Sequence, residues 1–294
     1  MSDKPDAGLR LLHVHAHPDD ESSKRAATTA YYVDRGARVM VVSCTGGEEG
    51  SILNPRLDSD ENRERMPQLR REEMAAAAEI LGIEHVWLGY RDSGFPEGDD
   101  WRPTSPEAFA LAPVDEAAGR LVKVIREFRP HVLTTYDEEG GYPHPDHVMT
   151  HTVSMAAVDA AADASLWPEH GEPWQVPKVY YQLGFHRDRF TALDDAMAAA
   201  GLDRPYAARL ANWPANREAR RPTTFIPAAD FFEVRNAALR AHATQIDPDD
   251  RFWFAVPVEV ERAGWPTEDF QLARSQVPTS LPESDLFAGL REQA

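Results

Sequence analysis

Cysteine is nearly absent from the sequence, because Cys44 is the single cysteine among 294 residues. One thiol excludes an intrachain disulfide, and so thiol-poor a composition is typical of a cytoplasmic protein. Cys44 ends an apolar stretch that predicts a strand. We therefore expect a buried, unreactive thiol at this position rather than a nucleophile.

Long apolar runs and the signals of export or nucleotide binding are missing as well. No stretch approaches the roughly 18 consecutive apolar residues of a membrane helix. The polar start, Met1-Ser-Asp-Lys-Pro-Asp6, lacks the apolar region of a secretory signal, so we expect a cytoplasmic protein with no membrane partner. No Gly-x-Gly-x-x-Gly follows the first predicted strand, which argues against NAD and against a nucleotide-binding oxidoreductase.

Basic side chains are in the minority, with 31 Lys and Arg against 49 Asp and Glu and a net charge of −18. Binding to a nucleic-acid backbone requires clustered Lys and Arg, so we expect no nucleic-acid partner. We interpret the acidity as a solvated surface, which favours solubility over attachment to a membrane. Hydrophobic residues make up 42% of the chain, enough for a sizeable globular core.

Short apolar strands alternate with amphipathic helical patterns through the first two thirds of the chain. This alternation predicts an α/β fold, in which a mostly parallel sheet carries helices on both faces and the crossovers are right-handed. The expected strands cover residues 11–17, 38–44, 83–88, 131–135 and 178–185, and the expected helices cover 23–36, 68–81, 114–128 and 148–162.

The remaining third of the chain has weaker patterns. Residues 94–113 read as a surface loop, and residues 186–230 mix short helical pieces with Pro-rich stretches. A helix is predicted at 231–244, a strand at 252–260, and a loop-rich segment over about the last 25 residues. We predict a single domain over residues 1–294, with a core at about 9–185 and a C-terminal elaboration at about 186–294.

The stretch from Leu11 to Glu21 gathers an imidazole and two carboxylates where a predicted strand ends. Pro18 ends this strand, because its nitrogen cannot donate to a ladder. His17, Asp19 and Asp20 therefore crowd onto one turn at the carboxyl end of a strand, where α/β proteins bind ligands. The alternative interpretation is a plain turn held by Asx hydrogen bonds, with a satisfied histidine beside it.

A similar polar cluster lies far downstream, in Tyr136-Asp-Glu-Glu-Gly-Gly-Tyr-Pro-His-Pro-Asp-His-Val148. It follows the strand predicted at 131–135 and leads into the helix that begins near Pro145. Both clusters thus occupy the same structural position, between a strand end and a helix start. Two such clusters favour a shared metal site over two unrelated turns.

Imidazole and carboxylate groups are good ligands for zinc, and a catalytic zinc site combines three protein ligands with one water. His17, Asp20 and His147 would supply such a set. Asp19 and His144 would then stay uncoordinated and serve as general base and general acid.

These motifs carry a family resemblance that covers most of the chain. His17-Pro-Asp-Asp-Glu21 and His144-Pro-Asp-His147 resemble the LmbE-like, or PIG-L, family of zinc-dependent N-deacetylases, which implies a Rossmann-like sheet. Thr45-Gly-Gly-Glu-Glu-Gly-Ser-Ile-Leu-Asn-Pro55 and Tyr90-Arg-Asp-Ser-Gly94 resemble its actinobacterial mycothiol branch. Ser22-Ser-Lys24 is more similar to the S-conjugate amidases of that branch than to its deacetylases.

The resemblance implies a hydrolase that cleaves the amide between glucosamine and the S-conjugated N-acetylcysteine of mycothiol S-conjugates. The implied cofactor is Zn²⁺, or Fe²⁺, which accepts the same ligands, and the implied partner is a small thiol-sugar conjugate. The alternatives are an N-acetylglucosaminyl-inositol deacetylase of mycothiol biosynthesis and a conjugate amidase dedicated to an antibiotic pathway. A non-catalytic metal- or sugar-binding module, which would not need Asp19, is the rival of another class. The oligomeric state is left open.

Four residues receive catalytic roles. We expect Asp19 to be the general base, with capping of the following helix as the alternative. His144 would protonate the departing amine or stabilise the oxyanion. Asp146 would set the tautomer of His144 and raise its pKa. Tyr142 would donate to the oxyanion, with packing at a loop edge as the alternative.

The remaining histidines near the motifs are weaker candidates. His13 and His15 share a strand face with His17 but lie deeper, so we expect satisfied, buried imidazoles. His151 follows His147 by one helical turn, a spacing that allows joint ligation. The resemblance does not assign His151 to the metal.

The resemblance also points to residues that hold the substrate. Glu48, Arg70 and Asp92 match positions that bind the glucosaminyl-inositol part, although Arg70 and Asp92 alone would more often form a surface ion pair. Lys24 matches a position where the amidase branch carries lysine and the deacetylase branch a small polar residue. It lies one helical turn past the metal turn, from where we expect it to reach the acyl portion of a larger conjugate. Arg25 departs from the pattern, which has glycine there, and a long cation at this place would narrow the entrance or contact an unusual conjugate.

Overall fold

A seven-stranded sheet in the order β3-β2-β1-β4-β5-β7-β6 organises the molecule. The structure is a computed structural model that describes residues 4–95, 103, 105–213, 221–249 and 252–291. The first five strands are parallel, and the last two run antiparallel to their neighbours. The strands are β1 (Arg10–His15), β2 (Arg38–Thr45), β3 (Glu84–Tyr90), β4 (Val132–Thr135), β5 (Lys178–Gln182), β6 (Thr224–Ile226) and β7 (Glu268–Ser275). The prediction of a mostly parallel α/β sheet is confirmed.

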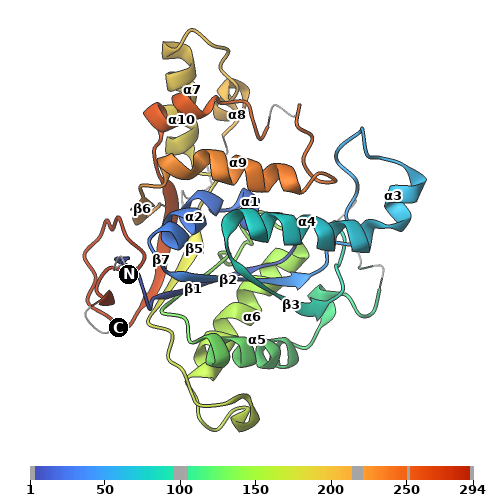
Figure 1. Cartoon of the computed structure of the whole chain (residues 1–294), viewed down its shortest axis with the longest axis vertical. Coiled ribbons are helices and arrows are strands. Elements are labelled where there is room, and N and C mark those ends of the chain that lie inside the picture. The colour runs from blue at the N-terminus through green and yellow to red at the C-terminus, as the bar shows by residue number, and fades with distance from the viewer. Residues whose placement is uncertain (1–3, 96–102, 104, 214–220, 250–251, 292–294) are drawn as a thin grey trace.

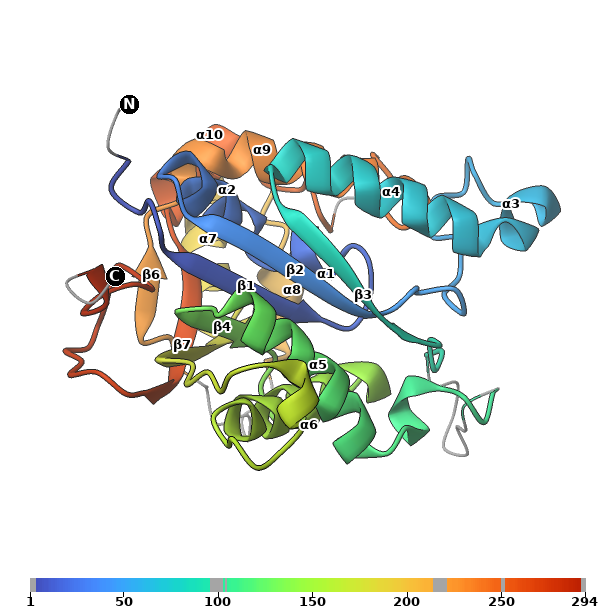
Figure 2. The same ribbon diagram turned by 60° about the horizontal axis from the view of Figure 1, so that its bottom comes forward.

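Helices cover both faces of this sheet, as predicted. Figure 2 shows α2, α4 and α9 on one face and α5 and α6 on the other, while α7, α8 and α10 lie together beyond α9 in Figure 1. The helices are α1 (Asp20–Ser23), α2 (Ala26–Asp34), α3 (Asp60–Glu64), α4 (Met66–Leu81), α5 (Val114–Phe128), α6 (Pro145–Ala161), α7 (Arg187–Ala199), α8 (Ala207–Ala211), α9 (Phe232–Ala241) and α10 (Val258–Gly264).

The order of the strands places the two sequence motifs side by side. β1 pairs with β2 on one side and with β4 on the other, both in parallel. The winding of the chain therefore changes direction between β1 and β4, and a crevice forms outside their carboxyl ends. The loop after β1 contains His17, and the loop after β4 leads to His147, so both motifs open onto this crevice.

Both faces of strand β1 are buried, one among apolar side chains and the other among polar side chains. Leu12 and Val14 belong to the apolar cluster that includes residues of α5 and α6. His13 lies on the other face, where the hydroxyls of Thr134 and Thr29 stand 2.6 Å and 3.1 Å from its ring nitrogens. His15 is 1% exposed and lies 3.4 Å from the hydroxyl of Tyr136. The prediction of buried, satisfied imidazoles at these two positions is confirmed.

The helix predicted at 23–36 is wrong in one respect, because it is divided into α1 and α2. The break falls at Lys24 and Arg25, and Arg25 adopts the left-handed backbone conformation with φ of 82°. A side chain is strained in this region and glycine is not, so Arg25 holds a backbone conformation that glycine would adopt more readily.

Two predictions for the C-terminal third are also wrong. Val258–Gly264 forms helix α10 and not a strand, although Val258 and Val260 alternate with glutamates. Pro257 precedes the first turn and Glu259 and Glu261 lie within it, features that favour a helix start. Residues 268–275 form β7, a strand that was not predicted because the sequence Glu-Asp-Phe-Gln-Leu-Ala-Arg-Ser is largely polar. The single-domain boundaries stay a prediction.

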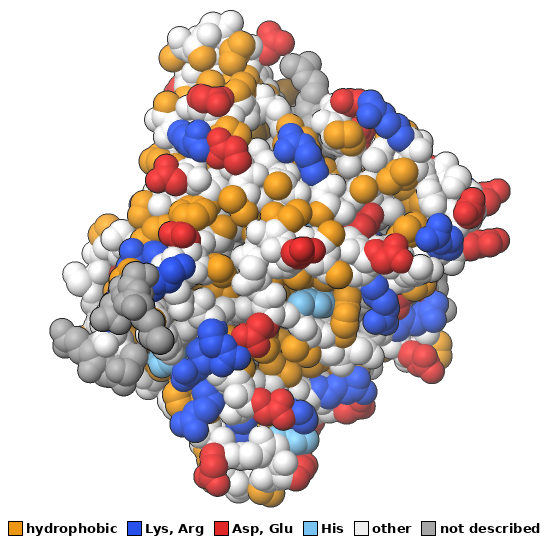
Figure 3. Space-filling view, viewed as in Figure 1, with side chains coloured by type: hydrophobic (Ala, Val, Ile, Leu, Met, Phe, Trp, Pro, Cys, Tyr) orange, Lys and Arg blue, Asp and Glu red, His pale blue; other side chains and the backbone are white. Residues whose placement is uncertain are grey.

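The described helices include none that is long and apolar enough to cross a membrane. On the face drawn in Figure 3, Lys and Arg side chains are interspersed with Asp and Glu side chains. Cys44 is fully buried, and burial raises the pKa of its thiol to about 12. The prediction of an unreactive thiol is confirmed.

Candidate metal centre and adjoining cavity

Three side chains from the two motifs converge at the carboxyl ends of β1 and β4. His17, Asp20 and His147 are buried, and each offers a ligand atom within 4.8 Å of the others. The rings of His17 and His147 have their centroids 5.3 Å apart, although the two residues are 130 positions apart in the sequence. The predicted ligand set is therefore assembled in one place.

Asp20 contacts both histidines of this cluster and two further side chains. Its Oδ2 lies 3.4 Å from Nε2 of His147 and 3.5 Å from Nδ1 of His17, and it accepts a 2.6 Å hydrogen bond from Tyr136. Its Oδ1 forms an ion pair with Lys24. Burial alone would raise the pKa of Asp20, but Lys24 and the histidines hold it well below its usual range. Asp20 is thus a carboxylate, the form that binds metal.

The second nitrogen of each histidine is already occupied. His147 donates from Nδ1 to the carbonyl of Gly140 over 3.0 Å, and its buried Nε2 finds no hydrogen-bond partner among the described residues. His17 has Nε2 at 3.2 Å from Asp146 and 3.5 Å from Asp92, which leaves Nδ1 facing Asp20. Ligating histidines are commonly oriented through their other nitrogen in this way. An orphaned buried nitrogen beside a carboxylate and a second imidazole fits a zinc or ferrous ion.

A second trio, His17, His144 and Asp146, also has its ligand atoms within 4.8 Å. Asp146 is otherwise engaged, because it accepts hydrogen bonds from the backbone and hydroxyl of Ser93. Nδ1 of His144 accepts from the backbone nitrogen of Asp146. The first trio, with its unpartnered nitrogen, is therefore the better metal site.

The Asp19 side chain has other partners than that of its neighbour Asp20. Its backbone is left-handed with φ of 94°, and its nitrogen donates to Glu21 over 2.9 Å. Its Oδ2 accepts from both terminal nitrogens of Arg70, each at 3.1 Å. Asp19 occupies the N-cap position of α1, but its side chain forms no capping hydrogen bond. The capping alternative is therefore wrong for the side chain.

The expected effect of Asp146 on His144 is not found. The carboxylate of Asp146 bonds to Ser93 and His17, and only its backbone nitrogen reaches His144. Burial, together with His17 and His147, lowers the pKa of His144 to about 3 instead of raising it. The prediction of a raised pKa at His144 is wrong, because burial above all, and then the two neighbouring imidazoles, disfavour the protonated ring.

Tyr142 and His151 lie at the edges of the cluster. The Tyr142 ring packs against His147 with centroids 4.5 Å apart, and the residue remains 37% exposed. The His151 ring donates to the carbonyl of Tyr136 over 3.0 Å, which explains its position without a role in ligation.

The residues expected to bind the sugar surround the metal centre. Arg70 and Asp92 are each 3% exposed, so the alternative of a surface ion pair is wrong. Asp92 accepts from the backbone of Gly94 and contacts His17, while its own nitrogen donates to Glu48 over 3.3 Å. Arg70 also donates to the carbonyl of Pro18 over 2.6 Å.

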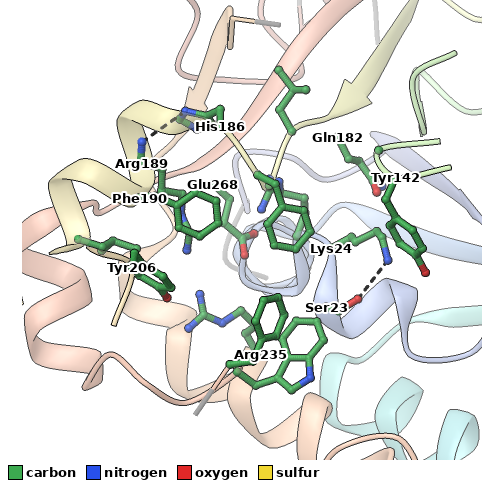
Figure 4. A pocket seen from close by; sticks show the side chains of 18 of the residues that line it. Ser23, Lys24, Tyr142, Gln182, His186, Arg189, Phe190, Tyr206, Arg235 and Glu268 are labelled. Carbon is green, nitrogen blue, oxygen red and sulfur yellow. Dashed lines mark hydrogen bonds between the residues drawn. The ribbon is translucent and has the colours of Figure 1, made fainter. Parts of the chain in front are cut away.

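A cavity of about 660 Å³ adjoins the metal centre. Lys24 and Tyr142 lie at the end next to the metal centre, and Arg25 also lines the cavity. Figure 4 shows that Arg189, Phe190 and other side chains from the segment after β5 form the opposite walls. The lining contributed by the segment after β5 includes Phe185, His186, Arg189, Phe190, Tyr206, Trp213, Arg235, Phe252, Trp253, Glu261 and Glu268.

Sequence reasoning missed several residues that hold the centre together. Tyr136 donates to Asp20, and Ser93 holds Asp146, although both lie within stretches that the sequence analysis quoted. Glu21 accepts from His242, which comes from the end of α9, over 2.6 Å. The spacing of the motifs gives no signal for His242, because 221 residues separate it from Glu21.

Comparison with known proteins agrees with this geometry. The PIG-L family profile, described as GlcNAc-PI de-N-acetylase, matches residues 12–158. The chain is 56% identical over 290 residues to a mycothiol S-conjugate amidase of Streptomyces coelicolor, covering 97% of this chain and 99% of the relative. It is 41% identical over 305 residues to a 1D-myo-inositol 2-acetamido-2-deoxy-alpha-D-glucopyranoside deacetylase of Streptomyces avermitilis, covering 99% of both chains.

Solved structures share the fold. The N,N'-diacetylchitobiose deacetylase of Pyrococcus horikoshii is similar with a TM-score of 0.62 and 19% identity, covering 92% of this chain and 86% of that one. The zinc-inhibited form of the teicoplanin deacetylase Orf2 is similar with a TM-score of 0.53 and 17% identity, covering 91% of this chain and 99% of that one. With the paired motifs in the loops after β1 and β4, these similarities lead to one conclusion: the chain belongs to the PIG-L, or LmbE-like, family.

Proposed function

We propose that this protein is a metal-dependent amidase that hydrolyses the amide between glucosamine and the S-conjugated N-acetylcysteine of mycothiol S-conjugates. One observation carries the proposal, namely the convergence of His17, Asp20 and His147 around the orphaned Nε2 of His147, with Asp19 alongside. The 56% identity to a mycothiol S-conjugate amidase supports the choice of substrate. A cavity of about 660 Å³ next to the centre supports an acyl group much larger than acetyl.

His17, Asp20 and His147 would hold the metal, with zinc and ferrous iron as the two ions that suit this set. A bound ion of this kind lowers the pKa of a coordinated water and polarises an amide carbonyl. Tyr136 and Lys24 would keep Asp20 oriented and ionised, and the carbonyl of Gly140 would fix the tautomer of His147.

Asp19 would take the proton from the attacking water. Arg70 holds its carboxylate from one side, and Glu21 accepts from its backbone nitrogen, so the side chain has a fixed direction. A base that is held in place in this way removes a proton without first being reoriented.

His144 would act on the scissile amide and not on the attacking water. Its Nδ1 accepts from the backbone of Asp146 over 3.1 Å, so a neutral ring carries its proton on Nε2 and donates from there. From there the neutral ring would donate a hydrogen bond to the oxyanion, and the proton that Asp19 took from water would pass to the departing glucosamine nitrogen. Tyr142 would donate at the mouth of the cavity, where it is partly exposed.

The remaining assignments concern the substrate. We propose that Glu48, Arg70 and Asp92 bind the glucosaminyl-inositol part and that Lys24 contacts the acyl part. Glu48 does not line the cavity of Lys24; it lines a second hollow, together with Thr45, Trp87 and Arg91.

The second candidate is the deacetylase of N-acetylglucosaminyl-inositol, which the 41% identity to such enzymes favours. The test compares kcat/KM for the bimane conjugate of mycothiol with kcat/KM for the acetylated sugar. We expect the conjugate to be preferred and Lys24→Ser to shift the preference toward the acetylated sugar. A clear preference of the wild type for the acetylated sugar would contradict the amidase proposal.

A further inference from the structure

Arg25 is a buried cation that its surroundings leave incompletely bonded. It is 4% exposed and has φ of 82°, and its Nε donates to the carbonyl of Asp269 over 3.0 Å. Its Nη2 finds no hydrogen-bond partner among the described residues. A left-handed backbone and an unpaired buried donor both cost stability, so an arginine here needs a compensating role.

The cavity beside Arg25 has room for a group that would supply that missing partner. Arg25 lines the cavity, and so does Gly184, the residue next to its Nη2. A Cβ atom on Gly184 would stand only 3.1 Å from this nitrogen. The absence of a side chain at Gly184 therefore keeps the space in front of the guanidinium open.

The charges of the cavity wall are unbalanced toward the positive side at this end. Arg189 and Arg235 share the single carboxylate of Glu261, at 2.7 Å and 2.6 Å. Glu268 has the largest electrostatic effect of any carboxylate on Arg25. It also accepts a hydrogen bond from the backbone nitrogen of Thr28 over 2.7 Å. Three guanidiniums thus line the cavity together with two carboxylates, and a third carboxylate, Asp269, acts on Arg25 and bonds to His186 without lining the cavity.

The other charged groups of the lining belong to the end next to the metal. Lys24 is paired with Asp20, and Asp137 and Glu139 lie in the loop that leads from β4 to the second motif. They do not alter the excess of guanidinium at the far end. Nε of Arg189 is a further buried donor without a partner in the described part of the chain.

Aromatic rings form another part of the lining, and the guanidinium of Arg209 lies over Phe185, Phe190 and Phe252. Ring centroids lie 6.0 Å apart between Phe185 and Phe190, 4.8 Å between Phe190 and Tyr206, and 6.1 Å between Phe185 and Phe252. Phe252 continues to Trp253 at 4.9 Å. Such a wall suits a flat apolar group, because aromatic rings pair well edge to face or offset.

We propose that this cavity selects conjugates whose S-linked substituent is an aromatic group bearing a carboxylate, and that Arg25 neutralises that carboxylate. The inference rests on the proposed amidase function and names the class of conjugate it acts on. The aromatic wall would take the ring, and the unpaired Nη2 of Arg25, with Nε of Arg189 nearby in the lining, would bind the acid. A charge-assisted hydrogen bond in a desolvated pocket is among the stronger polar contacts.

The test uses two mycothiol conjugates that differ in one group, the S-benzyl and the S-(4-carboxybenzyl) adducts. We expect the wild-type enzyme to hydrolyse the acid with a kcat/KM about tenfold or more above that of the neutral adduct, the range of one hydrogen bond to a charged group. Arg25→Gly, which suits the left-handed backbone, should abolish this preference. Arg25→Asn is a second variant that tolerates the same backbone but lacks the charge.

Arg129→Gly is the matched control, because Arg129 also has a positive φ, 55°, and does not line this cavity. It should keep the wild-type preference. Equal kcat/KM for the two adducts in the wild type, or a preference that survives in Arg25→Gly and Arg25→Asn, would overturn the inference and leave the amidase function standing. Failure to hydrolyse either adduct would overturn the proposed function and the inference with it.

Discussion

Arg70 holds Asp19 through both of its terminal nitrogens, each 3.1 Å from the same carboxylate oxygen. Arg70 comes from α4 and is 3% exposed, while Asp19 lies on the turn after β1. The guanidinium also binds the carbonyl of Pro18, so it fixes the turn and the carboxylate together. A residue predicted to bind sugar therefore also positions the proposed base.

Replacing Arg70 with lysine tests this positioning. Lysine keeps the charge but cannot reproduce the forked contact with Asp19 and Pro18, so we expect kcat to fall about tenfold, the effect of roughly one lost charged hydrogen bond. Bound metal should stay at the wild-type level. The matched control is Arg71→Lys, since Arg71 is exposed on the same helix and stacks on Trp87. Equal kcat values for the two variants would show that Arg70 does not position Asp19.

Asp19→Asn removes the proposed base and keeps the shape of the side chain. We expect kcat to fall about 10²- to 10⁴-fold, the usual contribution of a general base, with metal content unchanged. Asp60→Asn, in an exposed residue at the start of α3, is the control. If Asp19→Asn binds metal normally and turns over as fast as the wild type, Asp19 is not the base and the proposed mechanism is wrong.

Gly140 and Gly141 offer a matched pair that tests the support of His147. Both have positive φ, 72° and 74°, so alanine strains the backbone equally at either position. A Cβ on Gly140 would lie 2.7 Å from Cβ of His147, whereas a Cβ on Gly141 would meet nothing within 4 Å. Gly140→Ala should therefore weaken metal binding about tenfold or more, the usual effect of disturbing a ligand's support, as measured by competition with a chelator. Similar losses in Gly141→Ala would attribute the effect to backbone strain alone.

The metal centre could be predicted because its chemistry is concentrated in two short motifs. His17 and Asp20 are three residues apart, and His144 and His147 are equally close, so residue type and spacing carry the signal. The strand that precedes each motif indicates that it lies at the edge of the sheet where ligands bind. The partners of the ligands were harder to predict, because Tyr136 and His242 reach the centre through tertiary packing.

The cavity could not be predicted, because its wall is drawn from distant segments without a motif. Arg25, Phe185 and Trp253 line one cavity although they lie far apart in the sequence. Local patterns failed in the same region. The Val-Glu-Val-Glu alternation of 258–261 imitates a strand but starts a helix after Pro257, and the charged residues of β7 hide a strand that pairs with β5.

The metal content of two histidine variants tests the central claim, that two distant segments share one ion. His147→Ala removes a proposed ligand, and His151→Ala removes an imidazole one turn later on α6 that donates to Tyr136 instead. Mass spectrometry of the purified proteins should find about one zinc or iron per chain in the wild type and in His151→Ala, and little in His147→Ala. A full complement of metal in His147→Ala would contradict the account.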